Sequence, residues 1–421
     1  MPHHFISSAM MSQASFRLPV VQIYCRFGFL RWGRVGTDCG PTTFRTTYSH
    51  SYGMKIPIPF HIASLKAYKP GKAIADVIAE HGVSDVVKLA SNENPLGPSP
   101  KAIAAARESL ADLHIYPNGG RSIREAIANR YGLSVEEVIA GSGSEGVMNT
   151  MMRTFLSHGD EVVTSEGTFT GFYVLANALG LNLVMAPMTD YGYDLDAMLE
   201  RITPNTRLVY LANPNNPTGS VFGKDAFERF YAAVPPNVLI MHDEAYYDFA
   251  ISDIPGYYTL LDDIRPNVIT LRTFSKSHGL AGIRIGFGSG PKELIAPMLK
   301  VKLPFEPSAT AQAAGLGALG DDEFLARTIE TNRIGKEYLK NAFRELDLAF
   351  VETAANFICI RMGSEEAAQN LVAEMESRGI IVRPLGGFGL SDCVRISIGT
   401  PVENAKAVAA MRAILEGVTV A

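Results

Sequence analysis

Short apolar runs alternate with longer segments of helical periodicity along the chain from Met54 onward. Seven of the apolar runs predict strands, because each is short, nearly continuous and bounded by turn residues. They are residues 138–140, 161–164, 183–185, 208–211, 238–241, 268–271 and 284–288. Helix-length segments lie between most of them, such as residues 145–157, 170–179 and 224–233. Strands that alternate with helices predict an α/β fold with a mostly parallel seven-stranded sheet, covered on both faces.

The alternation becomes shorter beyond the last of these strands. Three helices and three strands are predicted there, at residues 309–319, 322–346 and 365–378 and at residues 357–360, 380–382 and 394–397. We therefore expect a large domain over residues 90–305 and a smaller α+β domain over residues 306–421. The N-terminal segment 54–89 is expected to complete the smaller domain.

Composition adds limits on the class of protein. The chain has 421 residues, 47% of them hydrophobic and 19% charged, as in an ordinary soluble globular protein. Its net charge of −5 provides no basic field for nucleic acid, and no uncharged apolar run is long enough to span a bilayer. The four cysteines show neither a CxxC pair nor metal-ligand spacing, which fits reduced thiols. We expect a cytoplasmic protein that binds no nucleic acid, membrane or metal.

The first 53 residues differ from the rest, because they contain five arginines, no lysine and a single acid, Asp38. An arginine-rich, serine-containing and acid-poor segment is typical of an organelle transit peptide. The alternative is an unstructured tail, or a translation start at Met54. We favour this alternative because no clear amphipathic helix pattern is present. Residues 1–53 are therefore left out of the fold prediction.

Lys276 follows the predicted strand at residues 268–271 and lies in a run of unusual chemistry. Hydroxyl groups precede it, Ser275 among them, and glycines and Arg284 follow it. Hydroxyls, glycine backbone and a guanidinium together suit a phosphate monoester. A partly desolvated lysine beside them can lose its proton and form a Schiff base with an aldehyde. A ligand that is both phosphate and aldehyde suggests pyridoxal phosphate. Taken alone, Lys276 is also compatible with a solvated surface charge.

Residues 141–146, with the sequence Gly-Ser-Gly-Ser-Glu-Gly, lie between a predicted strand and a predicted helix. This spacing fits the dinucleotide-binding motif GxGxxG, and Glu166 follows twenty residues later. An NAD-dependent oxidoreductase is therefore a rival hypothesis. The motif by itself indicates less, because exposed amides at a helix N-terminus bind either a pyrophosphate or a single phosphate.

Two further motifs follow predicted strands at their carboxyl ends, where α/β proteins bind ligands. The loop 213–219 contains two prolines and a glycine and carries Asn216, which we expect to contact a phenolic oxygen of the cofactor. Asp243 follows the strand at residues 238–241, where a carboxylate can pair with a pyridinium nitrogen. Tyr246 can reach the phenolic oxygen beside Asn216. The alternatives are an ordinary turn for the loop and a helix cap for Asp243.

In this order the motifs resemble those of fold-type I pyridoxal-phosphate aminotransferases of class I and II, and more narrowly the histidinol-phosphate aminotransferase family. The resemblance runs from about Met54 to Ala421. Its specificity comes from the joint order of six segments, each weak alone, at residues 91–97, 116–120, 213–219, 243–246, 272–286 and 394–399.

The resemblance implies a role for each matched residue. Lys276 would hold the cofactor aldehyde and later move a proton between substrate and cofactor. Asp243 would hold the pyridinium nitrogen, and Asn216 and Tyr246 the phenolic oxygen. The cofactor phosphate would be bound by Gly143, Ser144, Thr273, Ser275 and Arg284.

Two aromatic roles are also implied. Tyr116 would reach the phosphate of the neighbouring subunit's cofactor, which implies a homodimer. Phe169 would stack on the cofactor ring, with Phe172 as the alternative. The chain departs from the family here, because it lacks the proline usual just before this aromatic residue.

Arg395 and Arg383 are predicted on or beside strands near the C-terminus, and two arginines in one pocket suit anions. The resemblance implies that Arg395 binds the α-carboxylate of glutamate and that the pair also serves a phosphate ester. Tyr68 and Asn94 are the other expected substrate contacts. The alternative for both arginines is a surface ion pair.

The predicted reaction converts histidinol phosphate and 2-oxoglutarate into imidazole acetol phosphate and glutamate, as in histidine biosynthesis. The alternative is a broad-specificity aromatic amino acid aminotransferase, because the segment 383–390 is apolar and glycine-rich. A protein that binds the cofactor without turnover is disfavoured, since every group needed for proton transfer is present.

Overall fold

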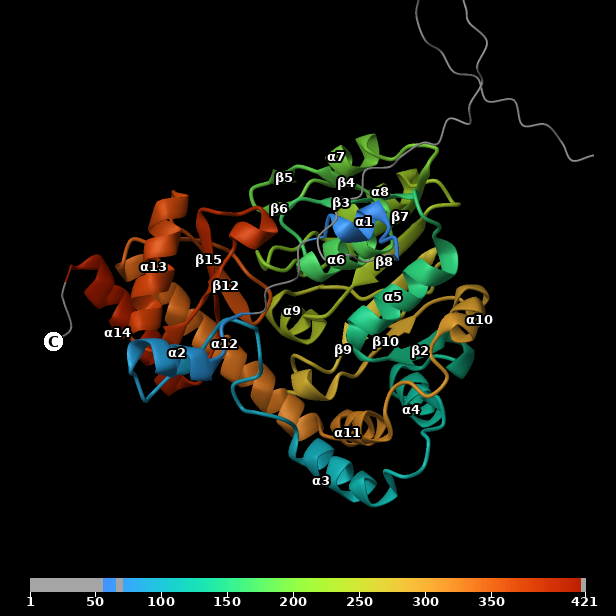
Figure 1. Ribbon diagram of the computed structural model, residues 1–421, viewed down its shortest axis with the longest axis horizontal. Coiled ribbons are helices and arrows are strands. Elements are labelled where there is room, and N and C mark those ends of the chain that lie inside the picture. Colours follow the sequence, from blue (N-terminus) through green and yellow to red (C-terminus); the bar gives the residue numbers. More distant parts are fainter. Residues whose placement is uncertain (1–55, 66–70, 418–421) are drawn as a thin grey trace, which may run out of the picture. The chain divides into compact units, whose positions relative to one another are not determined.

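A seven-stranded sheet forms the core of the larger part of the chain (Figure 1). The structure is a computed structural model that describes residues 56–65 and 71–417, so the predicted leader at residues 1–53 lies outside it. In spatial order the strands are β2 (Val138–Gly141), β10 (Gly286–Ser289), β9 (Val268–Thr273), β8 (Leu239–Asp243), β7 (Thr206–Ala212), β3 (Glu161–Ser165) and β4 (Asn182–Ala186). Strands β4, β3, β7, β8 and β9 are parallel neighbours, whereas β10 is antiparallel to β9 and β2. The predicted α/β fold is confirmed.

The side chains of successive strand residues point to opposite faces of the sheet, and helices cover both faces. The strands therefore have nearly continuous apolar sequences. Leu208 packs with the helices on one face, and Val209 packs with those on the other. The helices of the first face are α5 (Gly143–Phe155), α6 (Thr170–Ala178) and α10 (Lys292–Val301). Those of the second are α7 (Leu195–Glu200) and α8 (Lys224–Ala233). Each fully buried aliphatic side chain contributes about 1.5–3 kcal/mol, so burial of these residues on both faces of the sheet stabilises the fold.

The predicted strand at residues 284–288 begins two residues late, at Gly286. Arg284 has a φ of 57°, in the left-handed region, which a strand residue does not adopt. The backbone therefore turns at Arg284 before it enters the sheet.

A second, four-stranded antiparallel sheet supports the C-terminal part, drawn in orange to red in Figure 1. Its strands in order are β11 (Ala349–Val351), β12 (Phe357–Arg361), β15 (Cys393–Ser397) and β14 (Arg383–Pro384). The helices α12 (Asp322–Glu345), α13 (Glu365–Ser377) and α14 (Pro401–Leu415) bury apolar residues in the same core. Strand β1 (Val87–Lys88) pairs in parallel with β13 (Ile380–Ile381), so an N-terminal strand does join C-terminal elements.

Helix α11 (Ala309–Leu319) packs on the larger sheet, together with α3 (Pro100–Ser109) and α4 (Arg121–Tyr131). A Cβ atom at Gly317 would lie 2.5 Å from the carbonyl oxygen of Lys101, so the small residues of α11 permit this close approach. The predicted domain boundary at residue 305 stays a prediction, and the packing groups α11 with the elements before it.

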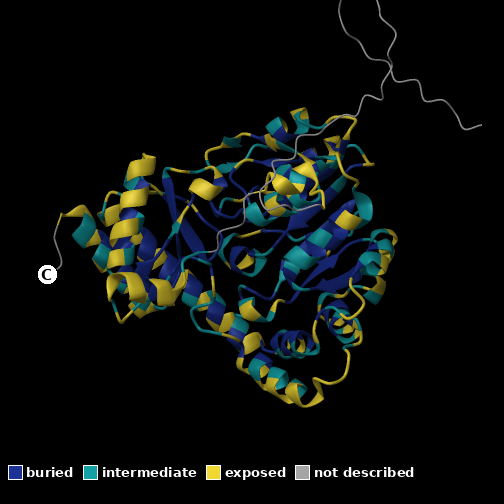
Figure 2. Cartoon of the chain, viewed as in Figure 1, coloured by how far each residue is buried: buried dark blue, intermediate teal, exposed yellow. Residues whose placement is uncertain are grey.

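The remaining elements are short and complete the framework. They are α1 (Phe60–Ala63), α2 (Ile74–His81), β5 (Met188–Thr189), β6 (Gly192–Tyr193) and α9 (Tyr247–Asp253). Figure 2 shows the strands of the two larger sheets mostly buried, while the long helices alternate buried and exposed positions. Among the described residues, none of the helices is both long and apolar enough to cross a membrane.

Candidate active site

A cavity of about 240 Å³ lies at the carboxyl ends of three central parallel strands. The last residues of β7, β8 and β9 line it, namely Ala212, Asp243 and Thr273. Strands of a parallel sheet end at one edge, and the loops that follow them form the cavity wall. The predicted site residues that line it are Ser144, Phe169, Asn216, Asp243, Tyr246, Thr273, Ser275, Lys276, Arg284, Arg383 and Arg395.

Lys276 enters this cavity from the loop after β9. Its Nζ donates to the carbonyl oxygen of Ser91 at 3.2 Å and lies 5.7 Å from the centre of the Tyr246 ring. Burial, and to a lesser degree the positive charge of Arg395, lowers the pKa of Lys276 to about 8. With a pKa of about 8, roughly a tenth of the amine is neutral at pH 7 and more at higher pH, and the neutral form is the one that a nucleophile or proton acceptor requires.

Asp243 is buried at the end of β8. Its carboxylate accepts hydrogen bonds from the hydroxyl of Tyr210 at 2.9 Å and from the backbone amide of Ala245 at 3.0 Å. Burial raises the pKa of Asp243 to about 6, although these two hydrogen bonds act in the opposite direction. A cation placed against this carboxylate would compensate its desolvation. Sequence reasoning missed Tyr210, because a tyrosine in an apolar strand fits the core equally well.

Tyr246 and Asn92 form a buried pair beside the cavity. The side-chain amide of Asn92 donates to the Tyr246 hydroxyl at 3.0 Å, and its carbonyl oxygen accepts from Ser397 at 3.1 Å. Burial raises the pKa of Tyr246 to about 12, so the hydroxyl keeps its proton and remains a donor. Asn92 was not among the predicted site residues. Its φ of 54° is a conformation that asparagine tolerates better than most residues.

A cluster of hydroxyl and amide groups forms one end of the cavity, where α5 begins. Thr273 donates to Ser275 at 3.0 Å, and the side chain of Arg284 donates to Glu145 at 2.9 Å. A Cβ atom at Gly286 would lie 2.5 Å from the backbone nitrogen of Ser144, so the strand touches the N-terminus of the helix. This close approach leaves no room for a side chain there.

The glycine motif at residues 141–146 is part of this cluster. Gly143 has a φ of 78°, and a Cβ atom there would lie 2.7 Å from Nη2 of Arg284. The preceding strand β2 lies at the end of the sheet and is antiparallel to β10. A dinucleotide motif follows a parallel strand inside a βαβ unit, so the rival hypothesis of an NAD-dependent oxidoreductase is wrong.

The two aromatic candidates lie in different places. Phe169 lines the cavity at the start of α6. Phe172 is buried in the core, where it stacks on Tyr210 with ring centres 4.2 Å apart. Phe169 is therefore the residue that can cover a ring in the cavity.

Arg395 on β15 lies directly opposite Arg383 on the neighbouring strand β14. Both side chains therefore point to the same face of the sheet. Arg395 is buried and donates to the side-chain oxygen of Asn216 and, at 2.7 Å, to the carbonyl oxygen of Ala90. Phe388 lies near both guanidinium groups, at 5.8 Å from Arg395 and 5.9 Å from Arg383. The cavity thus has two cations and one aromatic ring on its C-terminal wall.

Asn94 and Tyr116 were also predicted as site residues, but neither lines the cavity. The side chain of Asn94 lies behind Lys276, where it donates to the carbonyl oxygens of Lys276 at 3.3 Å and Ser277 at 3.0 Å. It holds the loop in place and does not line the cavity. Tyr116 is 76% exposed and stacks on Phe305, away from this cavity. Tyr68 lies outside the described residues.

Comparison with known proteins places the chain in a family. The family model of class I and II aminotransferases matches residues 84–411. A histidinol-phosphate aminotransferase of Moorella thermoacetica is 40% identical over 84% of this chain and 92% of its own length. One from Akkermansia muciniphila is 40% identical over 84% of this chain and 98% of its own.

A solved structure gives the same result. The histidinol-phosphate aminotransferase of Sinorhizobium meliloti, in complex with pyridoxal 5'-phosphate, superposes with a TM-score of 0.80 at 29% identity. The match covers 88% of this chain and all of that one. The chain therefore belongs to the histidinol-phosphate aminotransferase family of class I and II aminotransferases.

Proposed function

We propose that this protein is a pyridoxal-phosphate-dependent aminotransferase that acts on histidinol phosphate and 2-oxoglutarate. The products are imidazole acetol phosphate and glutamate, as in histidine biosynthesis. The observation that carries this proposal is the cavity, in which a buried lysine of lowered pKa faces a buried aspartate and two arginines. The names of the relatives support the choice of substrate.

The residues of the cavity fit pyridoxal phosphate by their chemistry. This cofactor, when bound, supplies an aldehyde that takes up the amino group and a ring that withdraws electrons. Asp243 would hold the ring nitrogen, and Asn216 and Tyr246 the phenolic oxygen. Phe169 would cover the ring. The phosphate would be held by the amides of Gly143 and Ser144 and by Thr273, Ser275 and Arg284.

Lys276 is the proton carrier in this proposal. Its neutral Nζ accepts the proton from the reacting carbon of the substrate and returns it at a second position. A proton acceptor works best when its pKa lies near the operating pH, and the pKa of about 8 meets this condition. Asp243 stays ionised at neutral pH, since its pKa is about 6, and so keeps a proton on the ring nitrogen.

Arg395 and Arg383 would recognise the two substrates in turn. The fork of a guanidinium matches both the carboxylate of glutamate and the phosphate ester of histidinol phosphate. Arg395 is held by Asn216 and Ala90, so it is already oriented before a substrate enters. This preorganisation lowers the entropic cost of binding.

The substrate proposal is tested by kcat/KM for histidinol phosphate and for phenylalanine, each with 2-oxoglutarate. We expect a preference for histidinol phosphate, because its phosphate ester can pair with both arginines of the wall, whereas phenylalanine offers a single α-carboxylate and its phenyl ring gains no ion pair. Phe388 favours the second candidate, a broad aromatic aminotransferase, since it offers a ring to stack on. Equal values of kcat/KM would favour that candidate.

We also propose a homodimer. Support comes from an exposed apolar patch around Tyr116 and Phe305, which are 76% and 52% exposed. Leu113 and Leu303 in the same two segments are 62% and 60% exposed. Such a patch is unusual on a monomer. Analytical ultracentrifugation is expected to give twice the chain mass of 45.6 kDa, and Tyr116→Ala is expected to weaken the dimer. A monomer at micromolar concentration would contradict this.

We also propose a cytoplasmic location. The free cysteines of the described part, Cys359 and Cys393, are both buried, as reduced thiols in a cytoplasmic enzyme often are. Cell fractionation with an antibody against the chain tests this location.

A further inference from the structure

A second row of polar side chains lies behind the cavity wall. Each residue of this row is the sequence neighbour of a residue that lines the cavity. Each is itself buried and does not line the cavity. The cavity residues are Asp243, Thr273 and Lys276. Their neighbours in the second row are Glu244, Arg272 and Ser277. The alternation of side chains at the ends of β8 and β9 produces this arrangement for Glu244 and Arg272, whereas Ser277 lies in the turn that follows Lys276.

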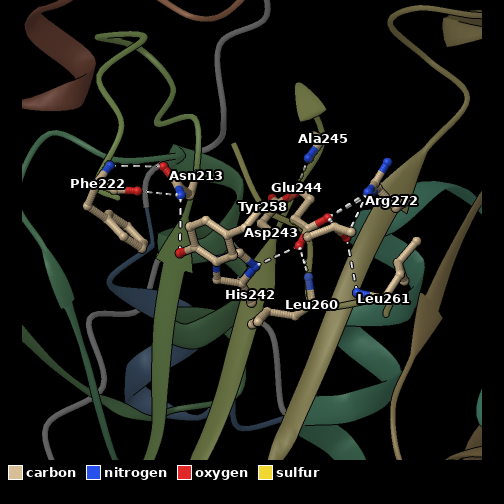
Figure 3. A network of polar contacts seen from close by, with 11 residues as sticks. Asn213, Phe222, His242, Asp243, Glu244, Ala245, Tyr258, Leu260, Leu261 and Arg272 are labelled. Carbon is tan, nitrogen blue, oxygen red and sulfur yellow. Dashed lines mark hydrogen bonds and ion pairs between the residues drawn. The ribbon is translucent and has the colours of Figure 1, made fainter. Parts of the chain in front are cut away.

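Glu244 and Arg272 are the centre of the row (Figure 3). Arg272 donates through Nε to one oxygen of Glu244 at 2.8 Å, and its Nη2 lies 2.8 Å from the same oxygen and donates to the hydroxyl of Thr259 at 2.9 Å. Thr259 donates to this oxygen of Glu244 at 2.7 Å, and the amide of Leu260 donates to the other at 2.8 Å. Burial alone would raise the pKa of Glu244, but Arg272 and His242 outweigh it and hold the pKa at about 2. The pair is therefore ionised at any pH at which the enzyme works.

Arg272 also connects to the loop that carries Lys276. Its Nη1 lies 3.7 Å from the carboxylate of Asp248 on α9, and its guanidinium lies 3.6 Å from the centre of the Tyr247 ring. The other oxygen of Asp248 accepts a hydrogen bond from Ser277, the residue after Lys276. One guanidinium thus joins the end of β8, the end of β9 and the lysine loop.

Stability alone is a poor explanation for this row. Removing two opposite charges from water costs several kcal/mol, so that a buried ion pair is often no more stabilising than apolar residues of the same volume. The charges instead fix the relative orientation of the segments that carry them. A guanidinium between two carboxylates can pair with both of them in only one arrangement. The segments it joins carry the nucleophilic lysine and the aspartate of the cavity.

We propose that Arg272 is a positioning residue of the aminotransferase, which acts through Glu244 and through Asp248 and Ser277 to fix Lys276 relative to Asp243. The inference deepens the proposed function and rests on it for the role of Lys276. It does not depend on the identity of the amino donor.

The experiment compares Ser277→Ala and Arg272→Lys with two matched controls. Ser289→Ala removes a buried hydroxyl in the same sheet that has no hydrogen-bond partner among the described residues. Arg265→Lys alters an arginine that is also bound to two acids, Glu228 and Asp263, and lies over Tyr231. Arg265 precedes β9 and lies outside the cavity.

The first measurement is kcat and KM with whichever donor the wild-type protein uses. Ser277→Ala is expected to lower kcat about tenfold, as for the loss of one hydrogen bond to a charged group. Arg272→Lys is expected to lower it about 100-fold, because a small misplacement of a reacting group has effects of that size. KM is expected to stay unchanged, since no substrate contact is altered.

The second measurement needs no amino donor. It is the rate at which the cofactor-free protein captures pyridoxal phosphate, followed by visible absorbance against pH. The charged groups around Lys276 are Arg395, Arg284, Glu93 and Glu145, together with Asp243 and Arg383 in the cavity wall, and neither variant alters them. A displaced Lys276 is better solvated, so the midpoint of the rate is expected to move above pH 8, towards the ordinary lysine value of 10.5.

The proposal is supported if both variants lower kcat and raise this midpoint while both controls match the wild type. It is overturned if the midpoint stays in place and kcat remains within the range of the controls. If Arg272→Lys fails to fold, Ser277→Ala alone decides, since it removes a single hydroxyl. A wild type that captures the cofactor but rejects histidinol phosphate refutes only the substrate proposal.

Discussion

The two larger sheets of this protein contribute different parts of the same site. The seven-stranded sheet ends in Asp243, Thr273 and the Lys276 loop, which in the proposed function carry out chemistry on any amino substrate. The four-stranded sheet contributes Arg395 and Arg383, which we propose select anionic substrates. Substitutions in the first sheet are therefore expected to lower kcat for every substrate. Changes in the second should act on KM and on the choice of substrate.

The largest effect is expected for Lys276→Ala. Loss of the only amine that lines the described cavity removes the proton carrier, which contributes about 10²–10⁴-fold to the rate, in addition to the covalent hold on the cofactor. Single-turnover kinetics and the visible spectrum of the bound cofactor measure the two losses. Full activity in this variant would refute the proposal that the larger sheet provides the catalytic groups and the smaller sheet the substrate contacts.

Asp243→Asn is expected to lower kcat about 10²-fold for every donor, because a neutral amide cannot stabilise a protonated ring nitrogen. The matched control is Asp262→Asn, an exposed aspartate on the same part of the chain. Steady-state kinetics with two donors measure the effect. A loss confined to one donor would contradict the general role of the larger sheet.

Arg395→Lys is expected to raise KM for 2-oxoglutarate more than tenfold with a smaller change in kcat, since an ammonium cannot keep both the Asn216 and Ala90 contacts and bind a carboxylate as a fork. Arg383→Lys is expected to act less strongly and mainly on the phosphorylated donor, because Arg383 is only half-buried. Separate titrations of the two substrates measure both values of KM. An equal fall of kcat in both variants would contradict the proposal that residues of the smaller sheet act on substrate binding and not on the chemical step.

The smallest predicted effect concerns pH in the unmodified protein. Burial depresses the pKa of Lys276 from 10.5 to about 8, so its amine is protonated below pH 8 and neutral above it. The rate of pyridoxal phosphate capture by the cofactor-free protein should therefore rise with pH and reach half its maximum near pH 8. Stopped-flow absorbance measures this rate. A midpoint near 10 would mean that Lys276 is solvated.

The strands of the larger sheet could be predicted from the sequence because most of them lie in the core. Inner strands of the larger sheet such as β7 are buried on both faces, so an unbroken apolar run such as residues 208–211 identifies them. Arg284 shows the limit of this pattern. Its left-handed backbone is imposed by the approach of the chain to the start of α5, and nothing in the local sequence requires it.

Several site residues could not be predicted because their contacts are long-range. Asn92 and Tyr246 are separated by 154 positions, and Asn94 and Lys276 by 182. Asn94 was predicted as a substrate contact, whereas its side chain donates to the backbone of Lys276 and Ser277 and does not line the cavity. Tyr210 and Arg272 gave no signal, because a tyrosine or an arginine at a strand end is compatible with many roles.

The sequence by itself determined the α/β class, the family and the chemical identity of the groups around Lys276. These properties depend on local periodicity and on the order of short motifs, which are encoded along the chain. Only the tertiary structure decided which of these groups face the cavity, how far burial lowers the pKa of Lys276 and which side chains stand behind it. Such properties depend on desolvation and on contacts between distant segments, and both exist only once the two sheets are packed.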